Sequence, residues 1–115
     1  DPPWIEVEVA DHPALPEAVQ VVLYRVAQEA VANARRHAKA AEIRVTLSAT
    51  EGRVTLTVTD DGIGIAPQPQ GTGIGLRTMR ERLRAVGGTF SIGRGPQGGT
   101  AVTARVPTAE RQAGS

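Results

Sequence analysis

In this 115-residue chain, the residues best suited to bind a ligand are two glycine clusters and an acidic pair. Asp60 and Asp61 precede the first cluster, Gly62-Ile63-Gly64, and the second cluster, Gly71-Thr72-Gly73-Ile74-Gly75-Leu76, follows it. Glycine lets a backbone approach a ligand closely. A carboxylate only accepts hydrogen bonds, so Asp60 suits the exocyclic amine of adenine and would reject guanine, which presents a carbonyl there. The alternative interpretation is an ordinary Asp-Asp-Gly turn at the end of a strand.

A polar stripe is expected on the helix that precedes these clusters, because Glu29, Asn33 and His37 are spaced by four residues. The stripe continues the line of Val22 and Val26, which places it at the edge of the buried face. Asn33 offers a hard oxygen suited to Mg²⁺, Glu29 could orient a nucleophile, and His37 could face a phosphate. The alternative is that Glu29 and Asn33 point to solvent and that His37 balances the helix dipole.

The second glycine cluster leads directly into another helix. The amides of Gly73 and Gly75, with the helix N-terminus behind them, would form an anion site for phosphates; the alternative is a flexible linker. The helix carries four arginines that more often form a solvated face than bind phosphate: Arg77, Arg80, Arg82 and Arg84. Thr100 opens a strand after two glycines, and its hydroxyl has a role only in the context of a site.

Hydrophobic periodicity supplies the elements that must position these residues. We expect a strand over 4–9, a long amphipathic helix over 17–38, a hairpin of strands 43–47 and 54–58, a mobile loop over 61–73, a helix over 74–86 and a closing hairpin of strands 89–92 and 100–106. This order predicts an α+β fold in which helices cover one face of a mixed, largely antiparallel sheet. Residues 1–107 would form one domain and 108–115 a disordered tail.

Composition excludes several classes of function. The net charge of +1 and the 3% of aromatic residues give no footprint for nucleic acid. No apolar run reaches membrane-spanning length, and the absence of cysteine excludes disulfides and thiolate metal sites. Lys39 is the only lysine, so neither a Walker-type phosphate loop nor the lysine of Ser/Thr/Tyr protein kinases is present. Neither cluster reads Gly-x-Gly-x-x-Gly, which excludes the dinucleotide fingerprint.

In combination, the motifs resemble the ATP-binding catalytic domain of sensor histidine kinases. Residues 25–38 resemble the asparagine box, residues 58–64 the first glycine box, residues 71–76 the second, and Gly98-Gly99-Thr100 the last glycine-threonine element. The helix sequence 77–83, followed by two glycines, resembles the NarX/DesK-type subfamily, which partners LuxR/NarL-type response regulators. No phenylalanine-rich box lies between the glycine boxes, as is typical of that subfamily. The resemblance covers residues 15–107.

The resemblance implies a Bergerat fold, a two-layer α/β sandwich with a mobile lid over ATP. It implies that Asn33 holds Mg²⁺, that Asp60 recognises adenine with Thr100 in the same network, and that Glu29 is the catalytic proton acceptor, although an acidic residue of another domain has this role in some members. His37 would face phosphate. The remaining residues implied to line the nucleotide and lid are Gly62, Gly64, Gly71, Gly73, Gly75 and Leu76.

The resemblance also implies partners. ATP would donate its γ-phosphate to a histidine on a dimerisation domain of the same parent protein, because His12 precedes a proline and His37 lies inside the site. The chain alone is therefore expected to be monomeric and unable to phosphorylate itself. Its parent is expected to be a cytoplasmic homodimer that an anchor could hold at a bacterial inner membrane. The alternatives are an anti-sigma-factor Ser/Thr kinase of the same superfamily, an interaction module with a vestigial pocket, and a topoisomerase or mismatch-repair ATPase.

Overall fold

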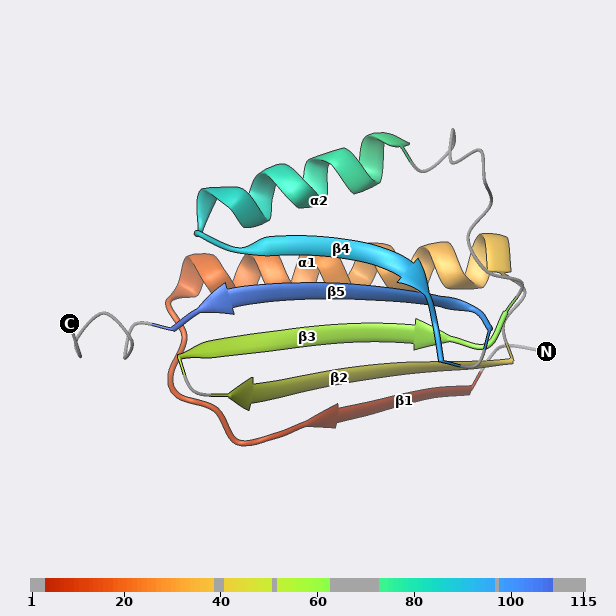
Figure 1. Cartoon of the computed structure of the whole chain (residues 1–115), viewed down its shortest axis with the longest axis horizontal. Coiled ribbons are helices and arrows are strands. Elements are labelled where there is room, and N and C mark those ends of the chain that lie inside the picture. The colour runs from red at the N-terminus through yellow and green to blue at the C-terminus, as the bar shows by residue number, and fades with distance from the viewer. Residues whose placement is uncertain (1–3, 39–40, 51, 63–72, 97, 109–115) are drawn as a thin grey trace.

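A computed structural model of the chain describes residues 4–38, 41–50, 52–62, 73–96 and 98–108 (Figure 1). Its elements in chain order are β1 (Trp4–Val9), α1 (Glu17–Asn33), the π-helical turn η1 (Ala34–Ala38), β2 (Glu42–Thr50), β3 (Arg53–Asp60), α2 (Gly73–Ala85), β4 (Thr89–Arg94) and β5 (Thr100–Pro107). The element order is the one that the sequence predicts.

The five strands form a single sheet in the order β1-β2-β3-β5-β4. β1 pairs with β2 in parallel, and every other neighbouring pair is antiparallel. Gly52 turns the β2–β3 hairpin with a φ of 80°, which glycine adopts without the steric penalty of other residues. The prediction of a mixed, largely antiparallel sheet in an α+β fold is therefore confirmed.

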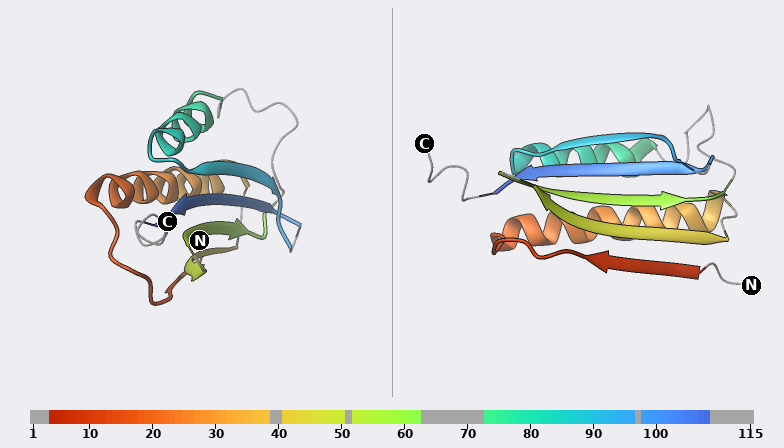
Figure 2. Two further views of the ribbon diagram at one scale, coloured as in Figure 1. Left: turned by 60° about the vertical axis from the view of Figure 1, so that its left-hand side comes forward. Right: turned by 60° about the horizontal axis from the view of Figure 1, so that its bottom comes forward.

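Both helices lie on one side of the sheet, as the two views of Figure 2 show. The alternation of β3 turns Val54, Leu56 and Val58 toward the helices, where each is buried. Against them packs the apolar face of α1, while α2 packs on β4 and α1. The core consists of Val19, Val22, Leu23, Val26, Ala30, Ala34, Ile43, Val54, Leu56, Val58, Met79, Leu83, Val102, Ala104 and Val106.

The second helix ends where the sequence predicts. Gly87 has a φ of 79° and its N–H donates to the carbonyl oxygen of Arg84, while the N–H of Gly88 donates to that of Leu83 at 2.7 Å. Such bonds satisfy the last carbonyls of a helix. A Cβ at Gly88 would come within 2.6 Å of the carbonyl oxygen of Arg105, so the glycine also allows β5 to pass close by.

The first helix departs from the prediction of one continuous α-helix over 17–38. The α-helix ends at Asn33, and residues Ala34–Ala38 form a π-helical turn instead. Alanine and arginine are good helix formers, so nothing local in the sequence signals the wider turn. The spacing of four that aligned His37 with Glu29 and Asn33 assumes α-helical geometry, so that argument does not hold for His37.

The residue after β5 belongs to the folded domain, whereas β1 lies at its exposed edge. Thr108, assigned to the tail, is buried and donates its N–H to the carbonyl oxygen of Gly52 at 3.1 Å. All six residues of β1 are exposed, because the helices cover the other strands and leave this edge of the sheet open. The predicted mobile loop falls largely, and the rest of the tail entirely, outside the described residues. No helix in the described ranges is long and apolar enough to cross a membrane.

Truncation of an apolar side chain should destabilise the domain more in the core than at the open edge of the sheet. Leu83 is fully buried, so Leu83→Ala should lower the free energy of unfolding by about 2–5 kcal/mol. Val9 is 60% exposed on the open edge, and Val9→Ala should cost less than about 1 kcal/mol. Urea titrations of the two variants measure the difference, and similar losses would contradict this assignment of the core.

Candidate functional site

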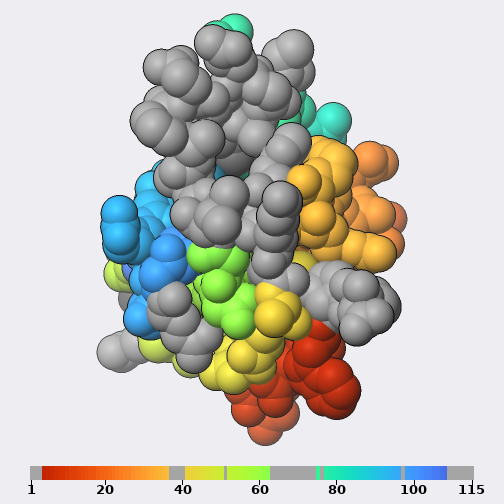
Figure 3. Space-filling model, turned by 90° about the vertical axis from the view of Figure 1, so that its right-hand side faces the viewer, coloured from red at the N-terminus to blue at the C-terminus, as the bar shows by residue number. Residues whose placement is uncertain are grey.

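The predicted site residues that the structure describes lie at one end of the sandwich. There β3 ends, β5 and α2 begin, and α1 gives way to η1 (Figure 1). Figure 3 looks onto this end, where the last turns of α1 in yellow-orange, the end of β3 in green and the start of β5 in blue share the face toward the viewer. Motifs that are far apart in the sequence therefore meet in space.

Asp60 is the best-defined residue of the site. It is the last residue of β3 and is only 8% exposed. Its Oδ1 accepts the N–H of Gly62 at 2.8 Å and, at the long distance of 3.4 Å, the N–H of Thr100. The bond to Gly62 is the local turn geometry that the alternative interpretation expects. Asp60 therefore has a structural role in the turn, whatever else it binds.

Glycine at position 99 is what lets the last motif reach this carboxylate. A Cβ at Gly99 would overlap both the carbonyl oxygen and the Oδ1 of Asp60. The antiparallel register brings the segment there, since Thr59 of β3 lies opposite Ala101 of β5. The first glycine box and the Gly98-Gly99-Thr100 element thus form one packed unit.

Asp61 ties the end of β3 to the start of β2. Its Oδ1 accepts the backbone N–H groups of Ala41 and Glu42, each at 2.9 Å. The N–H of Glu42, followed by those of Ala41 and Asp61 itself, stabilises the charged form and holds the pKa of Asp61 below its ordinary value of 3.8. The role of Asp61 is structural, and an asparagine oxygen could accept the same bonds.

Of the predicted polar stripe, Glu29 and Asn33 lie on α1 at the edge of its buried face. Asn33 is half-buried and the side chain of Glu29 is 35% exposed. The Nη2 of Arg36 donates to the Oδ1 of Asn33 at 2.9 Å and lies 3.9 Å from the Oε2 of Glu29. The alternative in which both stripe residues simply point to solvent is not what the structure shows.

Glu29 also links the stripe to the second glycine cluster. A Cβ at Gly75, in the first turn of α2, would come within 2.7 Å of the Oε2 of Glu29. A carboxylate beside a helix N-terminus is electrostatically favourable. The two motifs are therefore neighbours in space, and the missing side chain of Gly75 makes room for the carboxylate.

The other predicted site residues are placed less completely. Gly62 and Thr100 are half-buried beside Asp60, and Gly73 is the first residue of α2. Gly64 and Gly71 lie outside the described residues, as do the side chains of His37 and Leu76. The roles of these four residues remain predictions.

Sequence reasoning missed two contacts. Arg36 follows Asn33 by three residues, and side chains at that spacing meet on a helix, so this contact could have been inferred. The packing of Gly99 on Asp60 depends on a strand register that no local pattern specifies.

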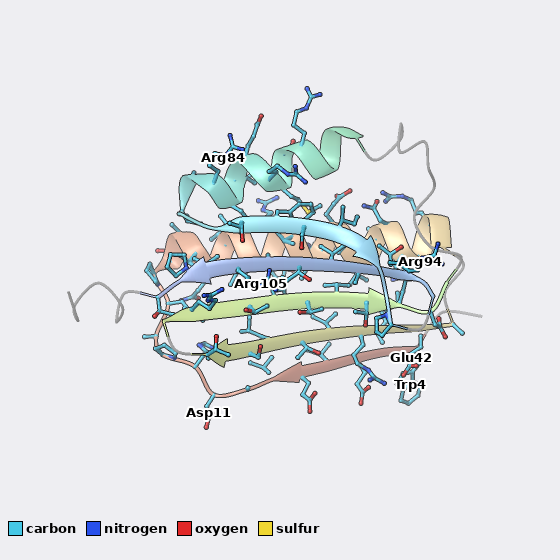
Figure 4. All side chains as sticks on the ribbon, in the orientation of Figure 1. Trp4, Asp11, Glu42, Arg84, Arg94 and Arg105 are labelled. Carbon is cyan, nitrogen blue, oxygen red and sulfur yellow. The ribbon has the colours of Figure 1, made fainter. Side chains whose placement is uncertain are left out.

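The arginines of α2 form a solvated face. Arg77, Arg80, Arg82 and Arg84 are exposed, and the guanidinium of Arg80 lies 5.5 Å from the centre of the Phe90 ring. Figure 4 shows Arg84 at the far end of α2, whereas Glu42 and Arg94 lie at the end of the sheet that carries Asp60. The alternative of a solvated arginine face therefore holds.

A solvent-open hollow lies at the same end of the sheet. It is lined by Glu42, Arg44, Thr59, Asp60 and Pro96. Arg44 and Thr59 face away from the helices, opposite each other in the β2–β3 register. The hollow shares Asp60 with the predicted site but not Asn33 or Gly75, so we do not identify it with the predicted nucleotide pocket.

A metal at this site would need most of its ligands from elsewhere. Among the described residues, no group of three or more acidic or histidine side chains could hold an ion. Mg²⁺ commonly takes one or two protein oxygens and completes its shell with substrate phosphates and water. Asn33 fits that use, because its amide oxygen already accepts a bond from a cationic group.

Comparison with known proteins gives a consistent result. A family model described as "Histidine kinase-, DNA gyrase B-, and HSP90-like ATPase" matches residues 18–110. No sequence among curated proteins matches the chain.

Several solved structures share the fold. The histidine kinase domain of the blue-light activated histidine kinase of Erythrobacter litoralis EL346 is 26% identical, with a TM-score of 0.75, over 95% of this chain and 54% of that one. Full-length ShkA in complex with AMPPNP is 28% identical, with a TM-score of 0.70, over 91% of this chain and 26% of that one. The mycobacterial sensor histidine kinase MprB is 22% identical, with a TM-score of 0.72, over 91% and 83%. The chain thus spans about half of that histidine kinase domain and about a quarter of full-length ShkA.

The role of Asp61 predicts a specific pH dependence. Because the pKa of this carboxyl is lower in the folded state, its stabilisation is fully present above the ordinary value of 3.8 and is lost as the pH falls through the lowered value. Asp61→Asn keeps an acceptor oxygen but cannot titrate. The difference in Tm between the wild type and this variant should shrink between about pH 6 and about pH 3. A difference that stays constant with pH would contradict the assignment.

Proposed function

Because the chain belongs to the histidine kinase-, DNA gyrase B- and HSP90-like ATPase family, we propose that it binds Mg-ATP and donates the γ-phosphoryl group to a histidine on a separate dimerisation domain. The proposal rests on the position of three features at one end of a domain that is homologous to histidine kinase catalytic domains. These features are the buried carboxylate of Asp60, the amide oxygen of Asn33 and the N-terminus of α2.

In this proposal Asp60 recognises adenine. Its carboxylate is buried and is fixed in place by the N–H of Gly62 and by close packing against Gly99. A fixed acceptor binds the exocyclic amine of adenine, whereas guanine would turn a carbonyl oxygen toward it. The mismatched base leaves buried polar groups unpaired, which is an effective basis for discrimination. Thr100, whose N–H also faces Asp60, would join this network.

The phosphates would lie between α1 and α2. Backbone N–H groups at the start of α2, including those of Gly73 and Gly75, are the donors that a helix N-terminus offers to anions. Asn33 would hold Mg²⁺, and when bound there the ion supplies charge neutralisation at the phosphates. By the family resemblance, Gly64, Gly71 and Leu76 would line the same region and His37 would face phosphate.

The proposed transfer is an in-line displacement. An imidazole nitrogen of the acceptor histidine forms a bond to the γ-phosphorus, and the bond from that phosphorus to the bridging oxygen breaks, leaving its electron pair on ADP. The imidazole proton passes to a carboxylate. Glu29 is the candidate within this chain, because it is part-exposed beside the start of α2; an acidic residue of the dimerisation domain is the alternative. Without that domain the chain should bind ATP but not phosphorylate itself.

The subfamily and the partners form the finer part of the proposal. We propose that the chain is of the NarX/DesK type, because the sequence of α2 and of the glycine pair that ends it resembles that subfamily. The parent would then be a cytoplasmic-facing homodimer acting on a LuxR/NarL-type response regulator.

Asp60→Asn should separate recognition from structure. The asparagine retains a carbonyl oxygen for the N–H of Gly62 but replaces the other acceptor with a donor. Loss of one hydrogen bond to a charged group predicts a dissociation constant for ADP raised about 10- to 100-fold, measured by calorimetry with Mg²⁺. The Tm of the ligand-free variant should change by only a few degrees, and an unchanged ADP affinity would contradict the adenine role.

Asn33→Ala should act mainly through the metal. The affinity for ADP in the presence of Mg²⁺ should fall about tenfold, since Mg²⁺ loses its ligand from the chain, and the affinity in EDTA should change little. Gln28→Ala on the exposed side of α1 is the matched control. Equal losses with and without Mg²⁺ would exclude the metal role of Asn33.

A further inference from the structure

We infer that Arg36 is a resident cation of the metal-free site, held on the Asn33 oxygen until Mg²⁺ displaces it. The inference rests on the proposed function, because it takes Asn33 as the metal ligand. It concerns a residue that the motif comparison leaves without a role.

The guanidinium of Arg36 is hydrogen-bonded to one oxygen and lies near a second. One nitrogen of the guanidinium, Nη2, donates to the Oδ1 of Asn33 at 2.9 Å and lies 3.9 Å from the Oε2 of Glu29. These two oxygens come from α1 at a spacing of four residues, and Arg36 reaches them from the π-helical turn that follows. A positive group is thus already bound to the oxygen that the proposal assigns to the metal.

Arg36 and a metal ion cannot both use this oxygen well. Mg²⁺ bonds its oxygen ligands at about 2.0–2.1 Å, which would bring two positive charges together on one amide oxygen. Like charges at such separations repel strongly in a partly desolvated site. Binding of Mg²⁺ at Asn33 therefore requires Arg36 to leave, and by linkage Arg36 lowers the affinity for the metal as much as the metal weakens the hold on Arg36.

The arginine is placed so that it can be displaced. Its side chain is 57% exposed, whereas that of Glu29 is 35% exposed. Exposed ion pairs are weak, so the hydrogen bond to Asn33 is the main interaction to be lost. Because this bond is exposed to solvent, its loss changes an equilibrium constant by only about 3- to 10-fold. Arg36 therefore lowers the affinity of the site for Mg²⁺ but does not prevent Mg²⁺ from binding.

Displacement of Arg36 by Mg²⁺ should change how strongly the metal enhances ADP binding. We define the metal factor as the dissociation constant for ADP in EDTA divided by that in saturating Mg²⁺. A contact of Arg36 with nucleotide that is equal in both conditions cancels from this ratio. Displacement of Arg36 occurs only when the metal binds, so it lowers the metal factor of the wild-type chain.

Calorimetric titrations of the whole 115-residue chain test the inference. Arg36→Ala should raise the metal factor about 3- to 10-fold, and Arg36→Gln, which can still donate a neutral bond, should raise it less. Arg35→Ala is the matched control, because this neighbouring arginine is exposed and is not among the described partners of Asn33 or Glu29. In an Asn33→Ala background, Arg36→Ala should leave the metal factor unchanged.

The outcomes separate the inference from the function. An unchanged or smaller metal factor in Arg36→Ala, with a clear metal effect in the wild type, overturns the role of Arg36 and leaves the nucleotide site intact. A wild-type chain whose ADP affinity does not depend on Mg²⁺ overturns the metal role of Asn33 and this inference together. Because Arg36 is exposed, its variants should fold normally, and an unchanged far-UV circular dichroism spectrum would verify this.

Discussion

The contact between the end of β3 and the start of β5 is the constraint on which the rest of the site depends. Asp60 can be buried there only because its carboxylate accepts the N–H of Gly62 and because position 99 carries no side chain. The register of the two strands sets this contact, with Thr59 opposite Ala101. Asp61 secures the same end of the sheet from the other side through the N–H groups of Ala41 and Glu42. A rigid acceptor at the strand end is the result.

The two helices add polar groups beside that rigid end of the sheet. α1 presents Glu29 and Asn33 at the margin of its apolar face, and the core residues of the same helix fix where that margin lies. The carboxylate of Glu29 reaches the first turn of α2 at the position where Gly75 has no side chain. Acceptor oxygens and helix-terminal N–H groups therefore face a common region, and Arg36 balances the local negative charge. This combination suits a ligand that carries a base, phosphates and a cation.

The sequence predicts the order of elements well, because each strand alternates and each helix has an apolar face. The boundaries of α2 and its glycine stop follow from local chemistry and are confirmed. The π-helical turn after Asn33 could not be predicted, since alanine and arginine favour an ordinary helix. The two interpretations of Asp60 were not exclusive, because one carboxylate can hold a turn and also face a ligand. Long-range register, as at Gly99, is the information that a single sequence lacks.

Adenine recognition is the central claim, and direct titration of the wild-type chain tests it most simply. We would measure binding of AMP-PNP and of GTP by calorimetry, each in the presence of Mg²⁺. The structure and the family membership predict saturable binding of the adenine nucleotide and a far weaker response to GTP. Equal affinity for the two nucleotides, or no binding of either, would contradict the account.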